Sequence, residues 1–504
     1  MDKKIIVGLD IGTTKIACFI GERRGEDQVR IIGFGKTESV GVERGIVLNI
    51  KDTGISIRKA VKQASEQAGV EVKEVYVGIA GQHIKSFQSQ GSIMIPSSHR
   101  EITEEDVEKL IEDQYRIMLG PGEEIIHIFP QSYIVDNEPL STEVSPIGVA
   151  GKCLKANFHI VTGNTNNLNN IRYSVDNAGL KIKGVVLEPI ASAYAVLDER
   201  DRDAGVALVD IGGGTTDIAI FSEGIIRHTS VLPLAGNAIT EDIRKGCGIL
   251  KSQAESLKTR FGSCLPSNVN EDDIISIPGI RKQPSREISM KTLAGIIHAR
   301  TQVILEQVNY EIQLSGYDKM LIAGVVLTGG GAKMKHLREL SELITTINTR
   351  IGSPDEHMEE PEDPNDPTLP KYEELCHPMY STGIGLVLYG MEQEMVSEEL
   401  EEIPEVEEIP EAENKAEEPQ AAAPTLDPND IFAQLSGMKT SEPTHSETPR
   451  LDPIPHPVQQ PPVNEGKKDK TKKTKPGGGG FGQSLKRYFT RVFEDSIEND
   501  EEDL

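Results

Sequence analysis

Two copies of one short string hold the residues of this chain that are best suited to bind a charged ligand. The first copy reads Leu9-Asp10-Ile11-Gly12-Thr13-Thr14-Lys15, and the second reads Val209-Asp210-Ile211-Gly212-Gly213-Gly214-Thr215-Thr216-Asp217. Each copy follows an apolar run that predicts a buried strand, at 4–9 and 205–209, and leads into another, at 16–20 and 218–221. We therefore predict two strand–turn–strand hairpins, which differ from the strand–loop–helix unit of a P-loop.

Each turn has the composition of a phosphate-binding cup. Glycine lets the backbone come close to a ligand, and successive amide N–H groups and threonine hydroxyls can donate to phosphate oxygens. Asp10 and Asp210 would repel phosphate unless a divalent cation such as Mg²⁺, with its water shell, lay between them. A single Gly-rich turn would predict only a turn. Two matched cups that face each other can hold a polyphosphate from both sides, so the pair predicts nucleotide binding.

The composition divides the chain near residue 390. The 504 residues carry a net charge of −27, of which residues 391–504 contribute −15. A chain this acidic is not expected to bind nucleic acid broadly. The five cysteines are scattered without a CxxC pair or a metal-binding spacing, as in a reduced cytosolic protein. We expect neither a signal peptide nor a membrane-spanning helix.

The elements that must position the two turns alternate between helices and strands. The patterns predict helices at 52–69, 166–178, 238–261, 290–314 and 334–343, and strands at 72–79, 182–187 and 325–328. Residues 81–162 differ, because strand-like runs flank a helix that Thr103 and Asp106 open as a capping box. We predict a compact α+β insertion there. Residues 352–378 predict an exposed loop, after which residue 378 opens a closing helix.

The order of these motifs resembles the superfamily of actin, sugar kinases and heat-shock chaperones. The superfamily has five signature elements, and this chain has a match for each of them in the same order. The first turn matches phosphate-one, the helix that begins at Glu188-Pro189 matches connect-one, and the second turn matches phosphate-two. Leu327–Ala332 matches the adenosine element, and Ser381–Gly385 matches connect-two. Within the superfamily the chain is most similar to the FtsA family of bacterial cell-division proteins, since the insertion falls where that family carries its own subdomain. The resemblance implies an α/β, actin-like two-lobed ATPase fold with a small inserted α+β subdomain, a disordered linker and a C-terminal amphipathic helix.

The resemblance also implies subdomain boundaries. The first lobe would have its core (IA) at 1–80, 163–198 and 379–390, and would carry the inserted subdomain (IC) at 81–162. The second lobe would have its core (IIA) at 199–235 and 301–378 and an outer subdomain (IIB) at 236–300. A disordered linker at 391–480 would lead to a membrane-targeting helix at 481–494.

Carried over position by position, the resemblance implies ATP and Mg²⁺ as ligands and slow hydrolysis at most. The phosphates would be held by Gly12, Thr13, Thr14 and Lys15 on one side and by Gly213, Gly214, Thr215 and Thr216 on the other. Asp10 and Asp210 would position Mg²⁺, largely through water, and Gly329, Gly330 and Gly331 would lie against the adenosine. Glu255 and Lys258 share one helix face, which would be turned to ribose and base or carry a surface ion pair. Glu188 would orient a water or fix the start of its helix.

The last predicted helix has an apolar face and a basic flank. The apolar residues recur at helical spacing, and they are Phe481, Leu485, Tyr488, Phe489, Val492 and Phe493. Lys486, Arg487 and Arg491 lie beside them. A short cationic helix with aromatic side chains lies in a lipid interface and does not span it, although docking on a protein groove is the alternative. The acidic residues after 493 would have to point away from anionic lipid.

Three functions remain open from the sequence. The resemblance implies a structural protein that binds ATP, polymerises and tethers the tubulin-like protein FtsZ to the cytoplasmic side of the inner membrane at the division site, where it recruits later division proteins. The FtsZ tail peptide would bind region 236–300, where Arg281, Lys282, Arg286 and Arg300 could face its charges. A sugar or acetate kinase of the same fold would have no use for a tethered membrane helix. A chaperone ATPase would need a β-rich substrate domain after residue 390.

Overall fold

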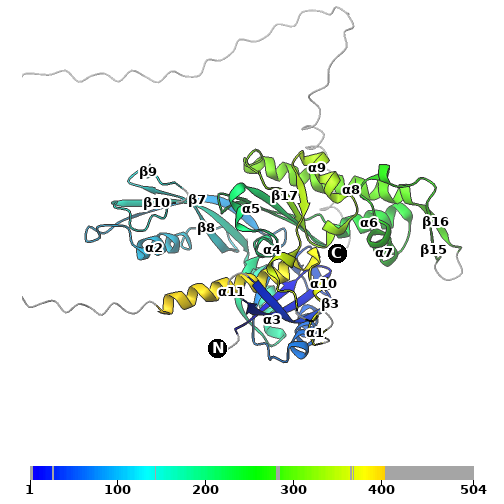
Figure 1. Ribbon diagram of the computed structural model, residues 1–504, viewed down its shortest axis with the longest axis horizontal. Coiled ribbons are helices and arrows are strands. Elements are labelled where there is room, and N and C mark those ends of the chain that lie inside the picture. Colours follow the sequence, from blue (N-terminus) through cyan, green and yellow to red (C-terminus); the bar gives the residue numbers. More distant parts are fainter. Residues whose placement is uncertain are drawn as a thin grey trace, which may run out of the picture. The chain divides into compact units, whose positions relative to one another are not determined.

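The first lobe is built on a five-stranded sheet that contains the first predicted hairpin (Figure 1). A computed structural model describes residues 4–24, 28–141, 144–279, 284–361, 363, 366 and 368–402. The sheet has the order β11-β6-β1-β2-β3, with β1 at Ile5–Ile11, β2 at Lys15–Arg24, β3 at Gln28–Glu38, β6 at Glu74–Ile79 and β11 at Lys181–Leu187. β1 and β2 are antiparallel and meet at Ile11 opposite Ile16, which confirms the hairpin.

Alternate side chains of this sheet enter two separate cores, as the two-residue period of a strand requires. One core packs against α1 (Ile50–Ala68) and α3 (Thr165–Asn177), and the other packs against α4 (Glu188–Val196) and α11 (Ser381–Glu402). The short strands β4 (Val42–Glu43) and β5 (Ile46–Val47) lie in the connection to α1. A central sheet covered by helices on both faces is the α/β architecture that the sequence predicts.

The second lobe repeats this arrangement. Its sheet has the order β14-β13-β12-β17-β18, with β12 at Val206–Ile211, β13 at Thr216–Ser222, β14 at Ile225–Leu232, β17 at Gly324–Thr328 and β18 at Thr349–Ile351. β12 and β13 form the second predicted hairpin, and β12 runs parallel to β17. The helices are α5 (Glu199–Ala204), α6 (Gly236–Cys247), α7 (Lys251–Phe261), α8 (Met290–Ser315) and α9 (Leu337–Thr345). The two short strings therefore belong to a repeat that extends to whole sheets.

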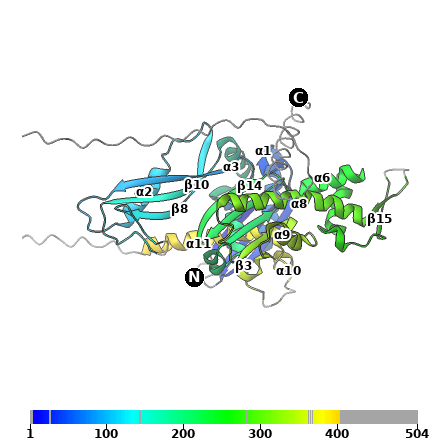
Figure 2. The same cartoon turned by 90° about the horizontal axis from the view of Figure 1, so that it is seen from above.

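The inserted subdomain has a sheet and a core of its own. Its strands β7 (Lys85–Met94), β10 (Cys153–Asn164), β8 (Glu123–Val135) and β9 (Glu138–Pro139) pair in that order, and α2 spans Glu104–Gln114. Both views show β8 and β10 reaching outward from the lobes (Figure 1, Figure 2). The Thr103 N–H donates to the Asp106 carboxylate at 3.0 Å, and the Asp106 N–H donates to Thr103 Oγ1 at 3.3 Å. These bonds confirm the capping box.

Close packing between α11 and its neighbours explains the small residues of connect-one and connect-two. A Cβ atom on Gly385 would lie 1.7 Å from the carbonyl oxygen of Ala191 in α4, and one on Gly383 would lie 2.1 Å from the ring of Phe19. Neither contact leaves room for any side chain. The two helices α4 and α11, which we call the crossing helices, are therefore held at backbone contact distance.

Several boundaries differ from those that the sequence predicts. The helical region at 238–261 is two helices, because Gly248 adopts a left-handed conformation (φ 61°) that ends α6. A 3₁₀ turn at Gly330–Lys333 precedes α9, which delays its start to Leu337. The closing helix continues to Glu402, so the linker does not begin at 391. Four further features were not predicted from the sequence: β3, β14, α5 and the hairpin of β15 (Ile274–Ile277) and β16 (Arg286–Ser289).

The segment at 352–378 is not simply an exposed loop of the second lobe. Met358 and Leu375 are buried in a core with first-lobe residues, and Met358 forms a parallel bridge to Val29. Arg30 Nε donates to the Glu359 carboxylate at 2.7 Å. The segment includes the short elements Pro354–His357 and α10 (Tyr372–Leu375), and the short element Pro378–Tyr380 begins at its last residue. Sequence periodicity could not predict this packing, because single apolar residues form it with partners that are distant in the sequence.

Part of the prediction falls on residues that the structure does not describe. Arg281, Lys282, the linker after residue 402 and the amphipathic helix at 481–494 lie outside the described residues. Among the described helices, none has both the length and the apolar composition that crossing a membrane requires.

Candidate functional site

The two Gly/Thr turns meet face to face. A Cβ atom on Gly213 would lie 2.4 Å from Thr14 Cγ2, and one on Gly214 would lie 2.4 Å from Thr13 Oγ1. The Gly45 N–H donates to Thr13 Oγ1 at 3.0 Å and fixes the first turn to the following loop. Glycine is therefore required in the second turn by its approach to the first. The structure brings together two turns that are about two hundred residues apart in sequence.

Asp210 anchors the second turn to both crossing helices. Its carboxylate accepts from Ser192 Oγ of α4 at 2.7 Å and from Thr382 Oγ1 of α11 at 3.1 Å. Burial raises the pKa of Asp210, although these two hydrogen bonds favour the charged form and oppose the rise. Ser192 and Thr382 thus orient a site carboxylate, a role that the sequence did not predict for them.

Lys15 and Asp10 form an ion pair at the first turn. Burial of Lys15 opposes its charge, but the carboxylates of Asp10, Asp210 and Glu188 raise its pKa above the usual value. The Lys15 ammonium also lies 5.6 Å from the centre of the Tyr380 ring. Lys15 is therefore charged and directed at the acidic side chains of the cleft.

Four carboxylates surround a cavity of about 80 Å³ between the turns. Asp10, Glu188, Asp210 and Asp217 line it, and Lys15 is the one cationic side chain among the described lining residues. Burial, followed by the charges of Asp10, Asp217 and Asp210, raises the pKa of Glu188 well above its usual value. Burial and the nearby Asp210 raise the pKa of Asp217 to about 8. The described side chains therefore do not keep all four carboxyl groups ionised, and a bound cation would favour their ionised forms.

Asp217 is a site residue that was not among those predicted from the sequence. It pairs directly with Asp210 across the β12–β13 hairpin, and its Oδ2 accepts from Thr215 Oγ1 at 2.8 Å. Its buried Oδ1 has no hydrogen-bond partner within the described part of the chain. The signal was present in the string itself, because residues paired across a two-stranded hairpin carry their side chains on the same face.

This donor set fits a hydrated divalent cation. Carboxylate oxygens are the ligands that Mg²⁺ prefers, and Mg²⁺ usually keeps several of its waters. Within the described ranges, no three His, Cys, Asp or Glu side chains converge closely enough to ligate one metal ion directly. A cation held here by Asp10, Asp210 and Asp217 would therefore be held largely through water, and it would also satisfy the unpartnered Asp217 oxygen.

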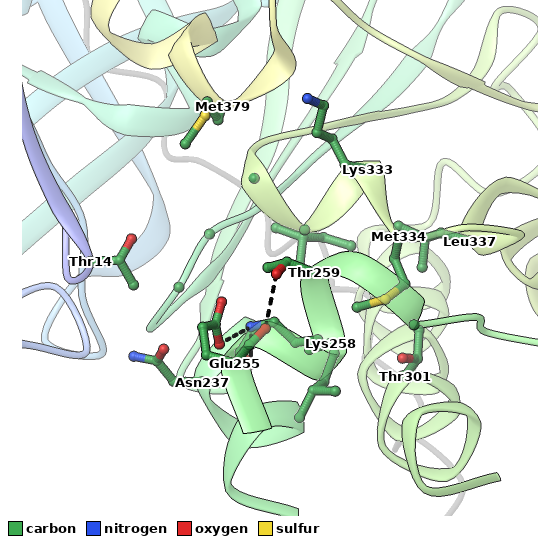
Figure 3. A pocket seen from close by; sticks show the side chains of 18 of the residues that line it. Thr14, Asn237, Glu255, Lys258, Thr259, Thr301, Lys333, Met334, Leu337 and Met379 are labelled. Atoms are coloured by element: carbon green, nitrogen blue, oxygen red, sulfur yellow. Dashed lines mark hydrogen bonds and ion pairs between the residues drawn. The ribbon is translucent and has the colours of Figure 1, made fainter. Parts of the chain in front are cut away.

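A second cavity, of about 380 Å³, adjoins the first (Figure 3). The two cavities are arms of one cleft, because they share five lining residues: Thr14, Gly212, Gly213, Gly330 and Met379. The larger arm is mainly apolar, and its lining includes Ile239, Gly262, Ile304, Gly331, Met334 and Leu337. A mainly apolar arm with a few polar groups, joined to a polar arm, suits a ligand with a flat organic part and a charged part.

Glu255 and Lys258 face this larger arm and also pair with each other. Their side chains lie 2.8 Å apart, and Figure 3 shows the pair at the side of the cavity. Lys258 Nζ donates further to the Gly236 carbonyl at 3.0 Å and to Thr240 Oγ1 at 2.8 Å. Burial lowers the pKa of Lys258. The ion pair is therefore present and lies in the cavity wall, and a contact of the two residues with ribose and base stays a prediction.

The structure changes the role of two other predicted residues. Thr216 is fully buried and lines neither cavity among the described lining residues, because its hydroxyl donates to the Leu234 carbonyl at 2.7 Å. Gly329 lines the smaller arm instead of the larger one, and a Cβ on it would lie 2.2 Å from Asp210 Oδ1. Gly330 and Gly331 line the larger arm, and their contact with adenosine stays a prediction. Lys333 and Met379 also line it and were not predicted.

Comparison with known proteins decides the family. Residues 207–385 match the protein family described as "Cell division protein FtsA". Residues 81–162, which are the residues predicted for the insertion, match the family described as "SHS2 domain inserted in FTSA". The FtsA of Pseudomonas aeruginosa is 37% identical over 391 residues, which cover 78% of this chain and 90% of that protein. This chain is a member of the FtsA family. The FtsA of Escherichia coli is 35% identical over 404 residues, 79% of this chain and 93% of that protein.

A solved structure of much lower identity supports the fold of the FtsA family member. The PilM–PilN type IV pilus biogenesis complex matches with a TM-score of 0.55 at 15% identity, over 76% of this chain and 98% of that one. At this identity the likeness concerns the fold alone. The chain thus has the actin-like two-lobed fold with an inserted subdomain and belongs to a family of cell-division proteins.

Proposed function

We propose that this member of the FtsA family binds ATP with Mg²⁺ in the cleft between its lobes and hydrolyses it slowly at most. The observation that carries the proposal is the meeting of two Gly/Thr turns beside four carboxylates, next to a larger and mainly apolar arm. The polyphosphate would lie between the turns, and the base and ribose would lie in the larger arm. Bound Mg²⁺ would neutralise phosphate charge and help to orient the phosphates.

Glu188 is the group best suited to orient an attacking water. It begins α4 at the wall of the smaller arm, and its raised pKa results from burial and three neighbouring carboxylates. A bound cation would favour the ionised form of Glu188, which can accept a hydrogen bond from water. Phosphoryl transfer to water needs little more than such positioning, which agrees with a slow reaction.

Family membership supports a wider proposal about the cell. We propose that the chain polymerises with ATP and tethers FtsZ to the cytoplasmic side of the inner membrane at the division site. The FtsZ peptide would bind the region at 236–300. Two of the four basic residues considered for that contact have internal partners, since Arg300 pairs with Asp242 at 2.6 Å and Arg286 donates to the Cys247 carbonyl at 2.6 Å. The peptide would have to contact other groups of this region or compete for these two.

Calorimetry should detect ATP binding that depends on Mg²⁺. We expect the affinity to fall at least about 10-fold when Mg²⁺ is removed with a chelator, because the phosphates then face the acidic arm without a cation between them. Inorganic phosphate release should be slow in the same samples. Equal affinity with and without Mg²⁺ would contradict the assignment of the acidic arm as a cation site.

Co-sedimentation with anionic liposomes should show that membrane attachment depends on the C-terminal helix and not on the nucleotide site. Phe489→Glu places a charge in the centre of the predicted apolar face, where burial of each large side chain is worth up to about 1.5–3 kcal/mol. We expect this variant to stay in the supernatant and to bind ATP as the unaltered chain does. Raised salt should weaken attachment only in part, because it screens the basic flank but not aromatic burial. Undiminished pelleting of a chain truncated after residue 480 would place the anchor elsewhere.

A further inference from the structure

A row of three rings in the inserted subdomain has no role in the function proposed so far. His127 and Phe129 lie on one face of β8, and His159 of β10 lies opposite Phe129 in the strand register. The ring centroids are 5.4 Å apart for His127 and Phe129 and 6.5 Å apart for Phe129 and His159. Burial lowers the pKa of both histidines to about 4, so both rings are neutral at neutral pH. The row is therefore an uncharged, packed wall of the subdomain.

One end of the row contacts the first lobe next to Glu188. The backbone N–H of Leu187 donates to His127 Nε2 at 3.1 Å. Leu187 ends β11, which is an edge strand of the first-lobe sheet, and Glu188 follows it. An outward N–H of an edge strand needs a partner from outside the sheet. His127 supplies that partner, so a side chain of the inserted subdomain helps to fix the point at which Glu188 leaves the sheet.

The other end of the row contacts the second lobe. His159 Nε2 and Thr229 Oγ1 are hydrogen-bonded at 2.9 Å, and Gln131 Nε2 donates to the Ile226 carbonyl at 2.7 Å. Thr229 and Ile226 belong to β14, which pairs along its length with β13. β13 carries Asp217 at its start. The same subdomain wall thus contacts the β13–β14 hairpin, which carries Asp217, one of the buried acidic residues of the second lobe.

We infer that the inserted subdomain positions the two acidic walls of the cleft relative to each other. His127 is a positioning residue for Glu188, while His159 and Gln131 position the β13–β14 hairpin that carries Asp217. The inference rests on the proposed function, because it assigns a role in ATP turnover to residues that line neither arm of the cleft. Coupling between two sites is reciprocal, so a partner that displaces the inserted subdomain would alter turnover without contacting the nucleotide.

A merely structural role for these contacts makes different predictions. Loss of a structural hydrogen bond lowers the unfolding free energy and leaves the turnover of the folded fraction unchanged. Loss of a positioning contact leaves nucleotide affinity nearly constant and slows the chemical step, because the reacting groups are held less well. Affinity and single-turnover rate must therefore be measured on the same variant.

The test compares His127→Phe with His127→Gln in the full chain. Phenylalanine keeps the ring beside Phe129 and removes the acceptor, whereas the glutamine side chain offers an amide oxygen that can accept from Leu187. We expect His127→Phe to bind Mg·ATP within about 2-fold of the unaltered chain and to hydrolyse it about 3- to 30-fold more slowly in a single turnover. His127→Gln should recover most of the rate. Gln90→Ala is the matched control, since its hydrogen bond to Asn157 joins two strands within the subdomain, and its rate should not change.

A second comparison asks whether His127 acts through Glu188. In the chain with Glu188→Gln, adding His127→Phe should slow turnover no further, because the group that His127 positions is already altered. Additive losses would overturn the assignment of His127 as a positioning residue for Glu188, and so would an unchanged rate in His127→Phe alone. Should His127→Phe fail to fold, Thr229→Val removes the hydroxyl at the other end of the row and is expected to slow turnover as well.

Amide hydrogen exchange gives a readout that does not depend on turnover. Mg·ATP should slow exchange in the unaltered chain at 225–232 and at 123–135, although the second segment lies outside the nucleotide contacts. His159→Phe should abolish the slowing at 123–135 and leave calorimetric affinity within about 2-fold. Slowing confined to the lobes in the unaltered chain would overturn the inference and leave ATP binding intact. Absence of ATP binding in the unaltered chain would instead contradict the proposed function.

Discussion

Asp210→Ala should weaken the binding of Mg·ATP about 10- to 100-fold, the loss expected when charge-assisted contacts worth about 1.5–3 kcal/mol disappear. Asp210 is buried at the end of β12, and both crossing helices hold its carboxylate. The substitution removes a charge that would position the cation and also leaves Ser192 and Thr382 without their acceptor. Isothermal titration calorimetry at saturating Mg²⁺ measures the loss directly.

Two further variants identify the cause of that loss. Ser192→Ala removes one hydrogen bond to the carboxylate and keeps its charge, so its effect on affinity should be several-fold smaller. Glu188→Ala removes a group that orients water, so it should weaken binding no more than Asp210→Ala does and should act mainly on turnover. Unchanged affinity in the Asp210 variant would contradict the two-turn site, and equal losses in the Ser192 and Asp210 variants would assign the effect to packing.

The sequence predicts the centre of this fold well because that centre is built from local patterns. Each hairpin needs only two apolar runs and a Gly/Thr turn between them, all within about twenty residues. The capping box of α2 and the glycine end of α1 are local in the same sense, and the structure contains both. The repeated string correctly indicated two hairpins, and the structure shows that each hairpin belongs to a five-stranded sheet.

What the sequence could not predict depends on contacts between distant residues. Ser192 and Thr382 are ordinary small residues of two helices until the fold places both beside Asp210. Met358 crosses to Val29 and makes part of a supposed loop into core. No window of sequence contains either contact. Thr216 illustrates the opposite failure, because its position in the motif suggested a ligand contact while the strand pleat turns its hydroxyl to Leu234.

The same distinction applies to the inserted subdomain. Its strands, its helix and its core are formed by residues within 81–162, so its boundaries could be predicted from the sequence. Its attachment to both lobes depends on His127, Gln131 and His159, whose partners lie at 187, 226 and 229. Isolated histidines in strands carry no pattern that would distinguish a core residue from a contact between subdomains.

Asp217→Asn should stabilise the nucleotide-free protein at pH 8 and remove part of its pH dependence. Burial and the charge of Asp210 raise the pKa of Asp217 from its usual 3.8 to about 8. Between these two values the folded chain keeps a proton that the unfolded chain has lost. The unfolding free energy therefore falls as pH rises through this window and levels off above about 8. Asparagine is neutral throughout, so thermal unfolding from pH 5 to pH 9 should show a smaller decline in the variant.

The same substitution should have the opposite effect on the ligand-bound state. Holding a cation requires the ionised carboxylate, so binding of Mg·ATP to the unaltered chain should release a proton near pH 7 and strengthen as pH rises toward 8. Asp217→Asn should bind more weakly and release fewer protons, which calorimetry in buffers of different ionisation enthalpy can count. Glu188 and Asp210 also have raised pKa values, and the charge of Asp217 contributes to the shift of Glu188, so the difference between the two proteins measures Asp217 together with its effect on this neighbour. Equal proton release, or a variant that is less stable at pH 8, would mean that Asp217 is already ionised and paired in the free protein.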